Sequence, residues 1–458
     1  MKNFDVHGKL LPAPSFFQVY NYGGGNGDKD REIVYAELTK DTPALVNYYY
    51  INNRYPHRFQ SRAFDQVSKY SRIGDLYNDI RQMLIYKKGE IYREYTSRPY
   101  DFNSKVFLLD SGAFNIVKQI AAATDYNGSE FESVLIQHMK DYYDFADRLK
   151  IDLVVSFDLG GKYTKKDNEN TNRKLNGFLG SIDADKINNR LLEETVKYLA
   201  EKHSYYPYVL AAVHGATRAD YDACMDHILE LEKKYSYSFW GFALGGIASY
   251  RQADPSWYQD INFRQIGKRG FVETVTPARA CRTVRAKAGT RPIHALGCGG
   301  YPNIAMNYFC GATSFDTASP VRRVGDGSAE STKLVYDARP HDKVAFSKYF
   351  VGGINADGTL RAEPCSYVKL NEVADTMPLC GCPACAAAGS IKNIKDLYAK
   401  KESDSEANYF SRQLMGLHAV WQHRRLCEIL PQFSDLNDFC DAYPSNLNKG
   451  LKQLYKQL

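Results

Sequence analysis

Short apolar runs alternate with longer amphipathic stretches from about residue 105 onward, and this alternation limits the possible folds more than any other feature. The runs with the length and composition of buried strands are 106–110, 153–158, 208–214, 241–245, 293–297 and 312–316. Segments with apolar residues at three- and four-residue spacing lie between them, at 130–149, 186–203 and 218–234. Strand–helix alternation of this kind predicts a parallel sheet covered by helices.

Most of the apolar runs end in a glycine or a polar residue, as at Asp110, Asp158, His214, Gly245 and Asp316. In a (β/α)8 barrel the C-terminal strand ends form one rim, and that rim holds the active site. A doubly wound open sheet also binds ligands at strand ends, but the glycine-rich phosphate-binding fingerprints of that fold are absent from the sequence. The pattern therefore favours an α/β fold of the TIM-barrel type.

The first hundred residues are less regular than the rest of the chain. We expect residues 44–50 to form the first barrel strand, and residues 1–375 to make up the barrel domain with an N-terminal extension. Hydrophobic residues make up 44% of the chain, which is too apolar for a disordered protein.

Three of the ten cysteines lie within six positions, as Cys380, Cys382 and Cys385. A tight turn lets such thiolates point at one centre, which is the arrangement that tetrahedral zinc requires. A site closed by a fourth protein ligand is structural, because catalysis needs an open position on the metal. Residues 376–458 are therefore expected to form a zinc-binding subdomain. The candidates for the fourth ligand are His418, His423, Cys427 and Cys440.

The net charge of +6 permits nucleic acid as a partner without requiring it. The sequence contains no apolar run long enough to span a membrane and starts without an apolar signal segment. Ten cysteines in 458 residues are too few for a disulfide scaffold. We therefore expect a cytoplasmic protein with no membrane association.

Three carboxylates stand at predicted strand ends: Asp110, Asp158 and Asp316. Any one of them alone is explained as a helix cap or a turn residue. Together on one rim they suit chemistry at an anomeric carbon, because one carboxylate can attack or stabilise that carbon while another moves a proton. Glycines at neighbouring strand ends, Gly246 and Gly297, would let a flat ring lie close to the backbone.

Several short motifs carry a resemblance to a known family. In chain order they are L-D-S-G-A-F at 109–114, S-F-D at 156–158, V-H-G at 213–215, G-F-A-L-G-G-I-A at 241–248, H-A-L-G-C-G at 294–299, F-D at 315–316, and C-x-C-x-x-C at 380–385 followed by Leu417-His418. This ordered set, which spans about residues 105–425, resembles that of the tRNA-guanine transglycosylases. Members of that family are zinc-containing TIM-barrel enzymes that exchange a guanine base for a 7-deazaguanine without cutting the strand.

The resemblance implies a role for each matching residue. Asp316 would be the nucleophile that attacks the sugar C1′ and holds the strand as a covalent glycosyl-enzyme. Asp110 would be the general acid and base for the leaving and incoming bases. Asp158 would accept hydrogen bonds from the N1–H and amino group of the guanine-type base.

The remaining matching residues would bind the base and the metal. His214 stands where the family has a glutamine that reads the base oxygen O6, and Gly246 would offer a backbone contact. The residues that would line or sandwich the ring are Ser111, Phe114 and Leu296. The resemblance also selects His418 as the fourth ligand of a structural zinc, beside Cys380, Cys382 and Cys385.

The base pocket is largely kept, with His214, Ala113 and Asn115 as departures from the family's residues, and the other departures lie in the parts that face the polynucleotide. Residues 318–323 replace the family segment that takes part in anticodon-loop recognition, and the stretch from Asp316 to Cys380 is longer. This pattern favours the DNA-modifying branch of the family, which places 7-deazaguanines, often the 7-cyano form, into DNA. The partners implied are nucleic acid, with DNA favoured over tRNA, the 7-deazaguanine base, and a second copy of the chain or accessory proteins.

Three other functions compete with this interpretation. The chain would act on tRNA if the rewritten segment still served anticodon recognition. It would be a catalytically inert partner subunit if its nucleophile were lost, although Asp316 is present in its Phe-Asp context. It would be an unrelated barrel hydrolase if its zinc kept an open position, which three thiolates and one histidine do not leave.

Overall fold

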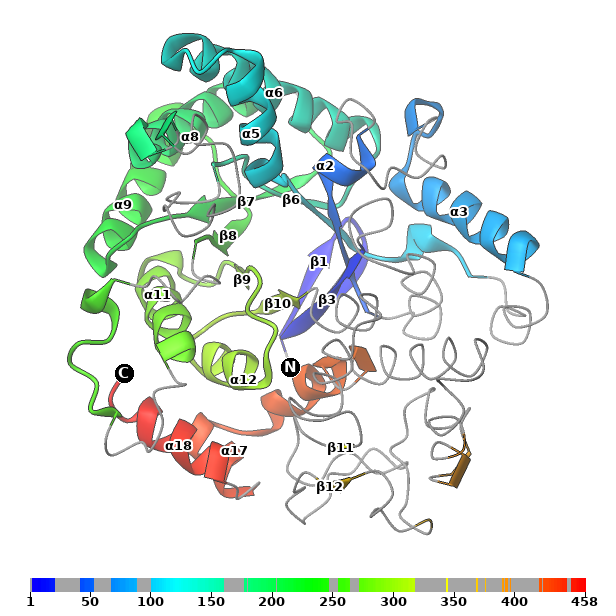
Figure 1. Ribbon diagram of the computed structural model, residues 1–458, viewed down its shortest axis with the longest axis vertical. Helices are drawn as coiled ribbons and strands as arrows, with labels where there is room; N and C mark the ends of the chain where they lie inside the picture. Colours follow the sequence, from blue (N-terminus) through cyan, green and yellow to red (C-terminus); the bar gives the residue numbers. More distant parts are fainter. Residues whose placement is uncertain are drawn as a thin grey trace.

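The computed structural model contains a closed barrel of eight parallel strands, in which the last strand pairs with the first (Figure 1). The strands in barrel order are β3 (Ser15–Tyr20), β4 (Ala44–Asn47), β5 (Phe107–Asp110), β6 (Leu153–Val155), β7 (Tyr208–Val213), β8 (Gly241–Leu244), β9 (Ile293–Ala295) and β10 (Ser314–Thr317). The expected TIM barrel is therefore confirmed, and each of the six apolar runs overlaps one of its strands.

The structure describes only part of the chain. The described residues are 2–20, 42–52, 67–88, 100–159, 177–178, 180–202, 204–246, 254–263, 272–317, 343–344, 368–369, 375, 389–390, 392–393, 396, 420–421, 423–442 and 446–458. The four expected zinc ligands, Cys380, Cys382, Cys385 and His418, lie outside these residues. The zinc-binding subdomain and the domain boundary near residue 375 thus stay predictions.

The expectation for the first barrel strand was wrong. Residues 44–47 form the second strand, β4, and the chain turns directly into the short helix α2 (Tyr48–Ile51). The first strand is β3, in which every residue is buried. A barrel strand packs on both faces, one toward the barrel interior and the other toward the helices, so it shows no polar alternation. The buried Gln18 interrupts the apolar run of β3 and weakens its signal in the sequence.

Helices surround the barrel on its outside (Figure 1). They are α3 (Ile73–Lys88), α5 (Ala113–Ala123), α6 (Gly128–Arg148), α8 (Ala184–Ala200), α9 (Arg218–Tyr235), α11 (Val272–Ala288) and α12 (Tyr301–Phe309). The three helices expected from periodicity correspond to α6, α8 and α9. Local capping fixes their starts: Asn127 caps α6, Asp183 caps α8, and Thr217 forms a capping box with Asp220 at α9.

Two apolar clusters make up the core. One fills the barrel with inward side chains from alternate strand positions, such as Phe17, Leu108 and Val155, and the other lies between the strands and the helices. The N-terminal end of the barrel carries the hairpin β1 (Lys2–Val6) and β2 (Lys9–Ala13). There the Lys9 ammonium forms an ion pair with the buried Asp152 at 2.9 Å. Side chains therefore fill that end, and the opposite rim is left for a site.

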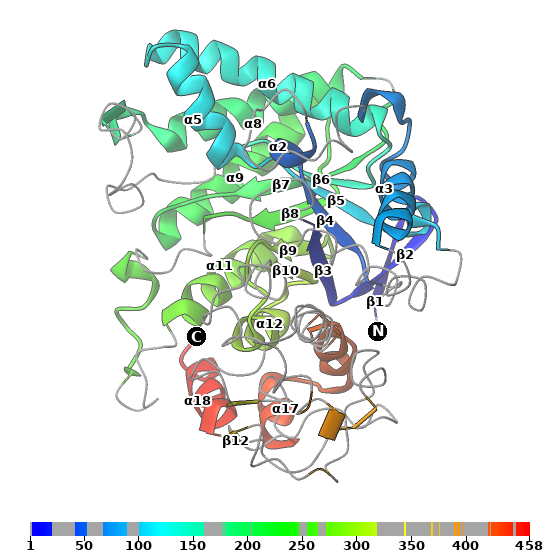
Figure 2. The same cartoon turned by 45° about the vertical axis from the view of Figure 1, so that its right-hand side comes forward.

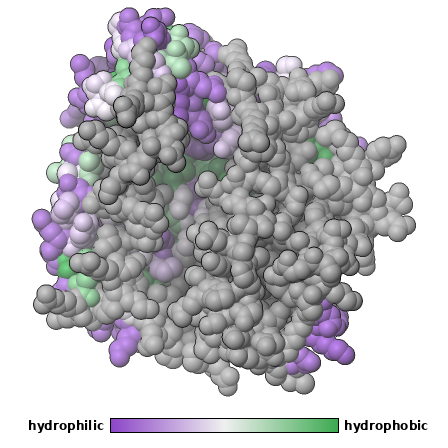
Figure 3. Space-filling view, in the orientation of Figure 1, coloured by the Kyte–Doolittle hydropathy of each residue, from purple (hydrophilic) through white to green (hydrophobic). Residues whose placement is uncertain are grey.

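The C-terminal helices pack against the barrel helices. Helices α17 (Leu436–Ala442) and α18 (Asn446–Tyr455) lie beside α12 in both views (Figures 1 and 2). The remaining elements are β11 (Lys343–Val344), β12 (Val368–Lys369) and the 3-10 helices η2 (Val67–Lys69), η3 (Phe102–Ser104), η6 (Pro255–Trp257) and η9 (Leu430–Gln432). In the described part of the chain, no helix has both the length and the apolarity to cross a membrane. Figure 3 shows hydrophilic residues at the outer edge of one face and apolar ones in its recessed centre.

Candidate active site at the barrel rim

The barrel brings the three predicted carboxylates to one mouth. Asp110 is the last residue of β5, Asp158 follows β6 closely, and Asp316 lies in β10. The charges of Asp158 and Asp316 both act on Asp110 and raise its pKa. The three side chains therefore share one electrostatic environment at the C-terminal end of the strands, as the sequence predicts.

Asp110 titrates near neutral pH. Burial, followed by the charges of Asp158 and Asp316, raises the pKa of the Asp110 carboxyl to about 7, against opposing backbone hydrogen bonds from Gly112 and Ser111. Asn47, its register partner on β4, donates from Nδ2 to Asp110 Oδ2 at 2.9 Å. A carboxyl group in this range both gives and takes protons at neutral pH, which suits a general acid and base.

Gly112 allows Asn47 to reach Asp110. Its φ of +64° lies in the left-handed region, and a Cβ there would stand 2.3 Å from Oδ1 of Asn47. Gly112 is also the N-cap of α5, so this turn joins the strand end to the helix. The neighbouring Ser111 is buried, and its Oγ accepts the backbone N–H of Ala113 at 3.2 Å.

The Asp316 carboxylate is held through one of its oxygens. The backbone N–H of Gly297 donates to Oδ1 at 2.7 Å, and Nε2 of His294 lies 3.2 Å from the same atom. Among the described residues, no hydrogen bond reaches Oδ2. Asp316 is only 7% exposed, so within the described part of the structure these contacts hold a buried carboxylate through Oδ1.

His294 is a buried residue that the sequence analysis did not assign to the site. It is 1% exposed, and its Nδ1 lies 2.8 Å from Oγ of Ser314 while Nε2 faces Asp316. An ionised Asp316 can only accept, so beside it Nε2 carries the proton and donates, and Nδ1 then accepts from the Ser314 hydroxyl, which can serve as donor or acceptor. The rings of Phe17 and His294 pack edge to face, with centroids 5.3 Å apart. The sequence signal that could have identified His294 as a site residue is its position in the H-A-L-G motif, two residues before Leu296.

His214 faces Asp158. Its Nε2 lies 2.7 Å from Oδ2 of Asp158. This distance is short enough for an ion pair with a protonated ring, but the contact does not meet the geometry of a hydrogen bond. His214 is 8% exposed, and neither ring nitrogen has a hydrogen-bond partner in the described part of the structure. A Cβ on Gly245 would stand 2.6 Å from Cε1 of His214, so the ring occupies the space that this glycine leaves open.

Buried aromatic residues support the two loops beside His214. Tyr221 donates its hydroxyl to the carbonyl of Gly245 at 2.8 Å, and the Trp257 indole N–H donates to the carbonyl of Ala216 at 2.8 Å. The rings of Tyr221 and Trp257 pack edge to face. Arg279 in turn donates to the Trp257 carbonyl at 2.9 Å. These contacts stabilise the loops that follow β7 and β8.

The other predicted base-contact residues lie at the same rim. Gly246 has a φ of +71° with open space beside its Cα, which leaves its backbone approachable. Leu296 is partly buried and packs on the barrel interior. Phe114 belongs to α5, but its side chain is outside the described part of the structure.

A cavity of about 180 Å³ lies between the ends of β6 and β7 and the first turns of α8 and α9. A 150 Å³ cavity is large enough for benzene, so this one has room for a planar ring. Its walls include Asp158, His214, Asn188, Asp220 and Cys224. Burial raises the pKa of the Cys224 thiol to about 11, so it stays protonated at neutral pH.

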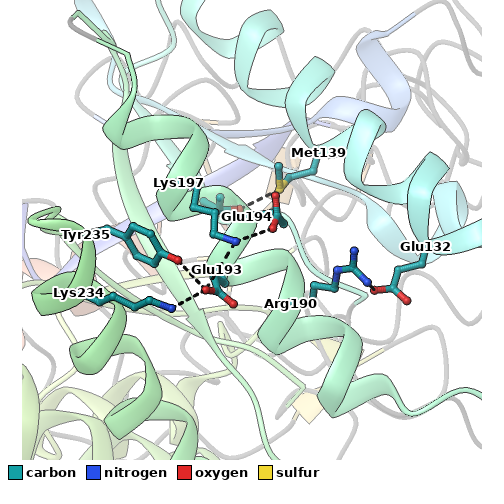
Figure 4. A network of polar contacts seen from close by, with 9 residues as sticks. Glu132, Met139, Arg190, Glu193, Glu194, Lys197, Lys234 and Tyr235 are labelled. Carbon is teal, nitrogen blue, oxygen red and sulfur yellow. Dashed lines mark hydrogen bonds and ion pairs between the residues drawn. The ribbon is translucent and has the colours of Figure 1, made fainter. Parts of the chain in front are cut away.

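An ion pair and a hydrogen bond join α8 to α9, both at Glu193 (Figure 4). Glu193 accepts from the Tyr235 hydroxyl at 2.6 Å and from the Lys234 ammonium at 2.9 Å. These two hydrogen bonds lower the pKa of Glu193 to about 2. The contacts hold together the two helices that form the outer wall of the cavity.

The expected zinc ligands lie outside the described residues. Of the other candidates, His423 is buried with its ring centroid 4.9 Å from that of Phe16, and Cys427 and Cys440 are buried free thiols. Within the described ranges, no group of three or more His, Cys, Asp or Glu side chains is arranged to hold a metal ion.

Comparison with known proteins does not assign the chain to a family. No protein-family model matches the chain, and no curated protein matches it. The fold and the rim define a TIM-barrel protein with an acidic mouth, and anything more specific depends on the residues themselves.

Proposed function

We propose that this chain is a guanine transglycosylase that exchanges a guanine base in nucleic acid, with DNA favoured, for a 7-deazaguanine such as the 7-cyano form. One observation carries the proposal. A carboxyl with a pKa of about 7, Asp110, shares the barrel mouth with Asp316, a buried carboxylate held through a single oxygen. Base exchange through a covalent intermediate needs both a proton carrier and a fixed nucleophile.

In the first step, Oδ2 of Asp316 attacks C1′ of the target nucleotide. The bond from C1′ to the base nitrogen breaks, its electron pair goes to the base, and protonated Asp110 gives that base a proton. The strand is then held as a glycosyl ester of Asp316. The contacts from Gly297 and His294 to Oδ1 favour this step because they orient the carboxylate. Both contacts end on Oδ1, so Oδ2 is the oxygen that we assign to the attack.

In the second step, the incoming 7-deazaguanine gives its ring N–H proton to Asp110. The freed nitrogen attacks C1′, and the bond from C1′ to Asp316 breaks, which regenerates the carboxylate. The configuration at C1′ is retained because two displacements occur on the same carbon. Asp158 would accept from the N1–H and amino group of either base, since that edge presents donors.

The target nucleotide has to leave its stack to reach a mouth of this kind. The preference for DNA rests on residues 318–323, which replace a tRNA-reading segment of the family and lie outside the described residues. Zinc, if bound by Cys380, Cys382, Cys385 and His418, would hold the C-terminal segment in shape, and no step of the exchange passes through it.

The test is incorporation of labelled guanine into nucleic acid. Purified protein is incubated with the labelled base and, in separate reactions, single-stranded DNA, duplex DNA or tRNA. We expect label in DNA, lost in D316N and D110N but kept in D226N, a matched change of an exposed carboxylate on α9. Labelling of tRNA alone would contradict the DNA assignment. No labelling of any polymer would contradict base exchange and favour an inert partner subunit.

A further inference from the structure

Tyr142, on α6, contacts the strands that carry the rim carboxylates. It is fully buried, and its hydroxyl lies 2.9 Å from the carbonyl oxygen of Leu109 and 2.8 Å from that of Val155. Leu109 precedes Asp110 in β5, and Val155 is the last residue of β6. A hydroxyl has only one proton to donate, so the ends of the two strands share a single donor in a three-centre hydrogen bond.

The pairing of β5 with β6 ends just before the rim. Leu108 pairs with Leu153 and Leu109 with Val154, whereas the pairing of β4 with β5 reaches Asp110 itself. In the described strands, the ladder between β5 and β6 therefore stops one residue short of Asp110. Beyond that point, the shared hydroxyl is a contact that joins the two strand ends.

The ring of Tyr142 contacts the sequence neighbours of two more rim residues. It packs edge to face on the ring of Tyr48, which follows Asn47, with centroids 5.2 Å apart. Its centroid also lies 5.7 Å from that of Phe157, which precedes Asp158. With the hydrogen bond to Leu109, one side chain of α6 thus contacts the sequence neighbours of three rim residues.

The spacing of the carboxyl groups determines how strongly they interact. Burial, followed by the charges of Asp158 from the loop after β6 and Asp316 from β10, raises the pKa of Asp110 to about 7. The group that β4 adds is the uncharged amide of Asn47. Tyr142 is neutral as well, because burial raises the pKa of its hydroxyl well above the usual value. Tyr142 therefore acts on Asp110 through geometry and not through a charge of its own.

We propose that Tyr142 is a positioning residue whose shared hydroxyl sets the spacing between Asp110 and Asp158. Its consequence for base exchange rests on the proposed function, whereas the spacing itself does not. Without the hydroxyl, the strand ends lose their common donor, and repulsion between the two carboxylates moves them apart. The Coulomb interaction on Asp110 then weakens, so the pKa of this carboxyl falls toward the ordinary range of an aspartate.

The experiment follows the titration of Asp110 through protein stability. Urea unfolding of wild type and D110N is measured from pH 4 to pH 9. The wild-type free energy of unfolding minus that of D110N should fall as the pH rises, and it should level off once the folded-state pKa of Asp110 is passed. The pH at which it levels off is the levelling point, and the same pair is measured in the Y142F background.

Y221F is the matched control. Tyr221 is also fully buried, and it donates its hydroxyl to the carbonyl of Gly245, directly after β8. The two variants lose the same chemical group from equally buried positions, but only Tyr142 joins β5 to β6. The comparison therefore separates the spacing of the carboxyls from the general loss of a buried hydrogen bond.

We expect the levelling point to lie near pH 7 in wild type and in Y221F, and near about pH 6 in Y142F. A purely structural Tyr142 would lower the stability at every pH and leave the levelling point near pH 7. If Y142F is too unstable to unfold reversibly in buffer, all series are repeated in sucrose, which favours the folded state.

A levelling point that stays near pH 7 in Y142F, or that moves equally in Y221F, would overturn the positioning role. Base exchange is tested separately, by incorporation of labelled guanine with wild type. If exchange occurs, adduct formation at pH 7 should be about fivefold slower in Y142F, because a smaller fraction of Asp110 is protonated. If no guanine is incorporated while the levelling point moves, the proposed function fails and the positioning role of Tyr142 stands.

Discussion

His294 Nε2 lies 3.2 Å from Oδ1 of Asp316, the oxygen that also accepts the Gly297 N–H. Two contacts on one oxygen fix the plane of the carboxylate. On the proposed function, the second oxygen would be the atom that meets the substrate in the barrel mouth. The predictions below follow from this arrangement and from the residues around it.

Replacing Asp316 by Asn should remove covalent chemistry. The amide keeps the volume and can still accept from Gly297, but it is not a nucleophile toward C1′, so exchange should fall by roughly three orders of magnitude or more. Wild-type protein mixed with an oligonucleotide, without incoming base, should give a shifted band on a denaturing gel. D316N should give none, and adding the base should release the wild-type adduct. A shifted band in D316N would show that another residue is the nucleophile.

Changes at His294 should slow adduct formation in a graded way. H294Q retains a donor that can reach Oδ1, whereas H294F fills the space with an apolar ring and, among the described residues, leaves only the Gly297 N–H to donate to that atom. We expect H294F to form the adduct about tenfold to a hundredfold more slowly, with H294Q between it and wild type. Rapid-quench measurement of the first turnover checks this order. Equal rates in all three proteins would mean that His294 serves only packing.

The pH dependence of the two half-reactions should have opposite signs. Asp110, whose pKa is raised to about 7, must be protonated to help the first base leave and ionised to accept the proton of the second. Adduct formation should therefore fall as the pH rises through about 7, and adduct release by added base should rise over the same range. Single-turnover rates between pH 5 and 9 measure both, and D110N should lose both inflections.

The same carboxyl should influence stability. The folded state raises the pKa of Asp110, so between about pH 4 and pH 7 the folded protein binds more protons at this group than the unfolded chain does. Its contribution to the free energy of unfolding therefore falls as the pH rises through this window. D110N removes the buried charge, so its melting temperature relative to wild type should be higher at pH 8 than at pH 4. The opposite order would contradict the raised pKa.

Gly245→Ala should be destabilising through His214. The new Cβ would stand 2.6 Å from Cε1 of His214, so the ring or the loop must shift, at a cost of about 1–3 kcal/mol in unfolding free energy. In the H214A background the same change should cost much less, because the colliding ring is gone. A double-mutant cycle from urea unfolding measures this coupling. G128A, at a site with open space, is the control.

Zinc remains a prediction from the cysteine spacing. Purified protein should contain one zinc per chain, and C380S or C385S should lose it. A cobalt-substituted sample should show the absorption of a tetrahedral thiolate site. An octahedral, oxygen-rich signature would contradict the closed site and favour a barrel hydrolase with catalytic metal.

The barrel was predictable because its strands repeat one pattern, an apolar run that ends in a polar residue or glycine. Because all strands of such a barrel run in the same direction, their C-terminal ends lie on one rim. The sequence alone therefore predicts that Asp110, Asp158 and Asp316 lie together. Strand β3 was missed because the polar Gln18 lies inside its buried run and a hairpin precedes it.

Individual side chains were harder to predict than the rim. Tyr142 lies on a helix, and only the fold shows that its hydroxyl is shared between the ends of β5 and β6. The His214 ring was expected to face the base, yet its orientation depends on the absence of a side chain at Gly245. Such contacts arise from packing between distant segments, which no local pattern in the sequence encodes.

The cluster of acidic groups at the mouth also determines how far a nucleic acid can penetrate. Asp158 and Asp316, joined by Asp110 when it is ionised, repel a polyanion at short range, while an uncharged purine and its sugar meet no such Coulomb barrier. The phosphates on either side of a flipped nucleotide must then stay outside the barrel, where cations of the protein or the solvent can neutralise them. Entry would thus be restricted to a single nucleoside by charge as well as by size.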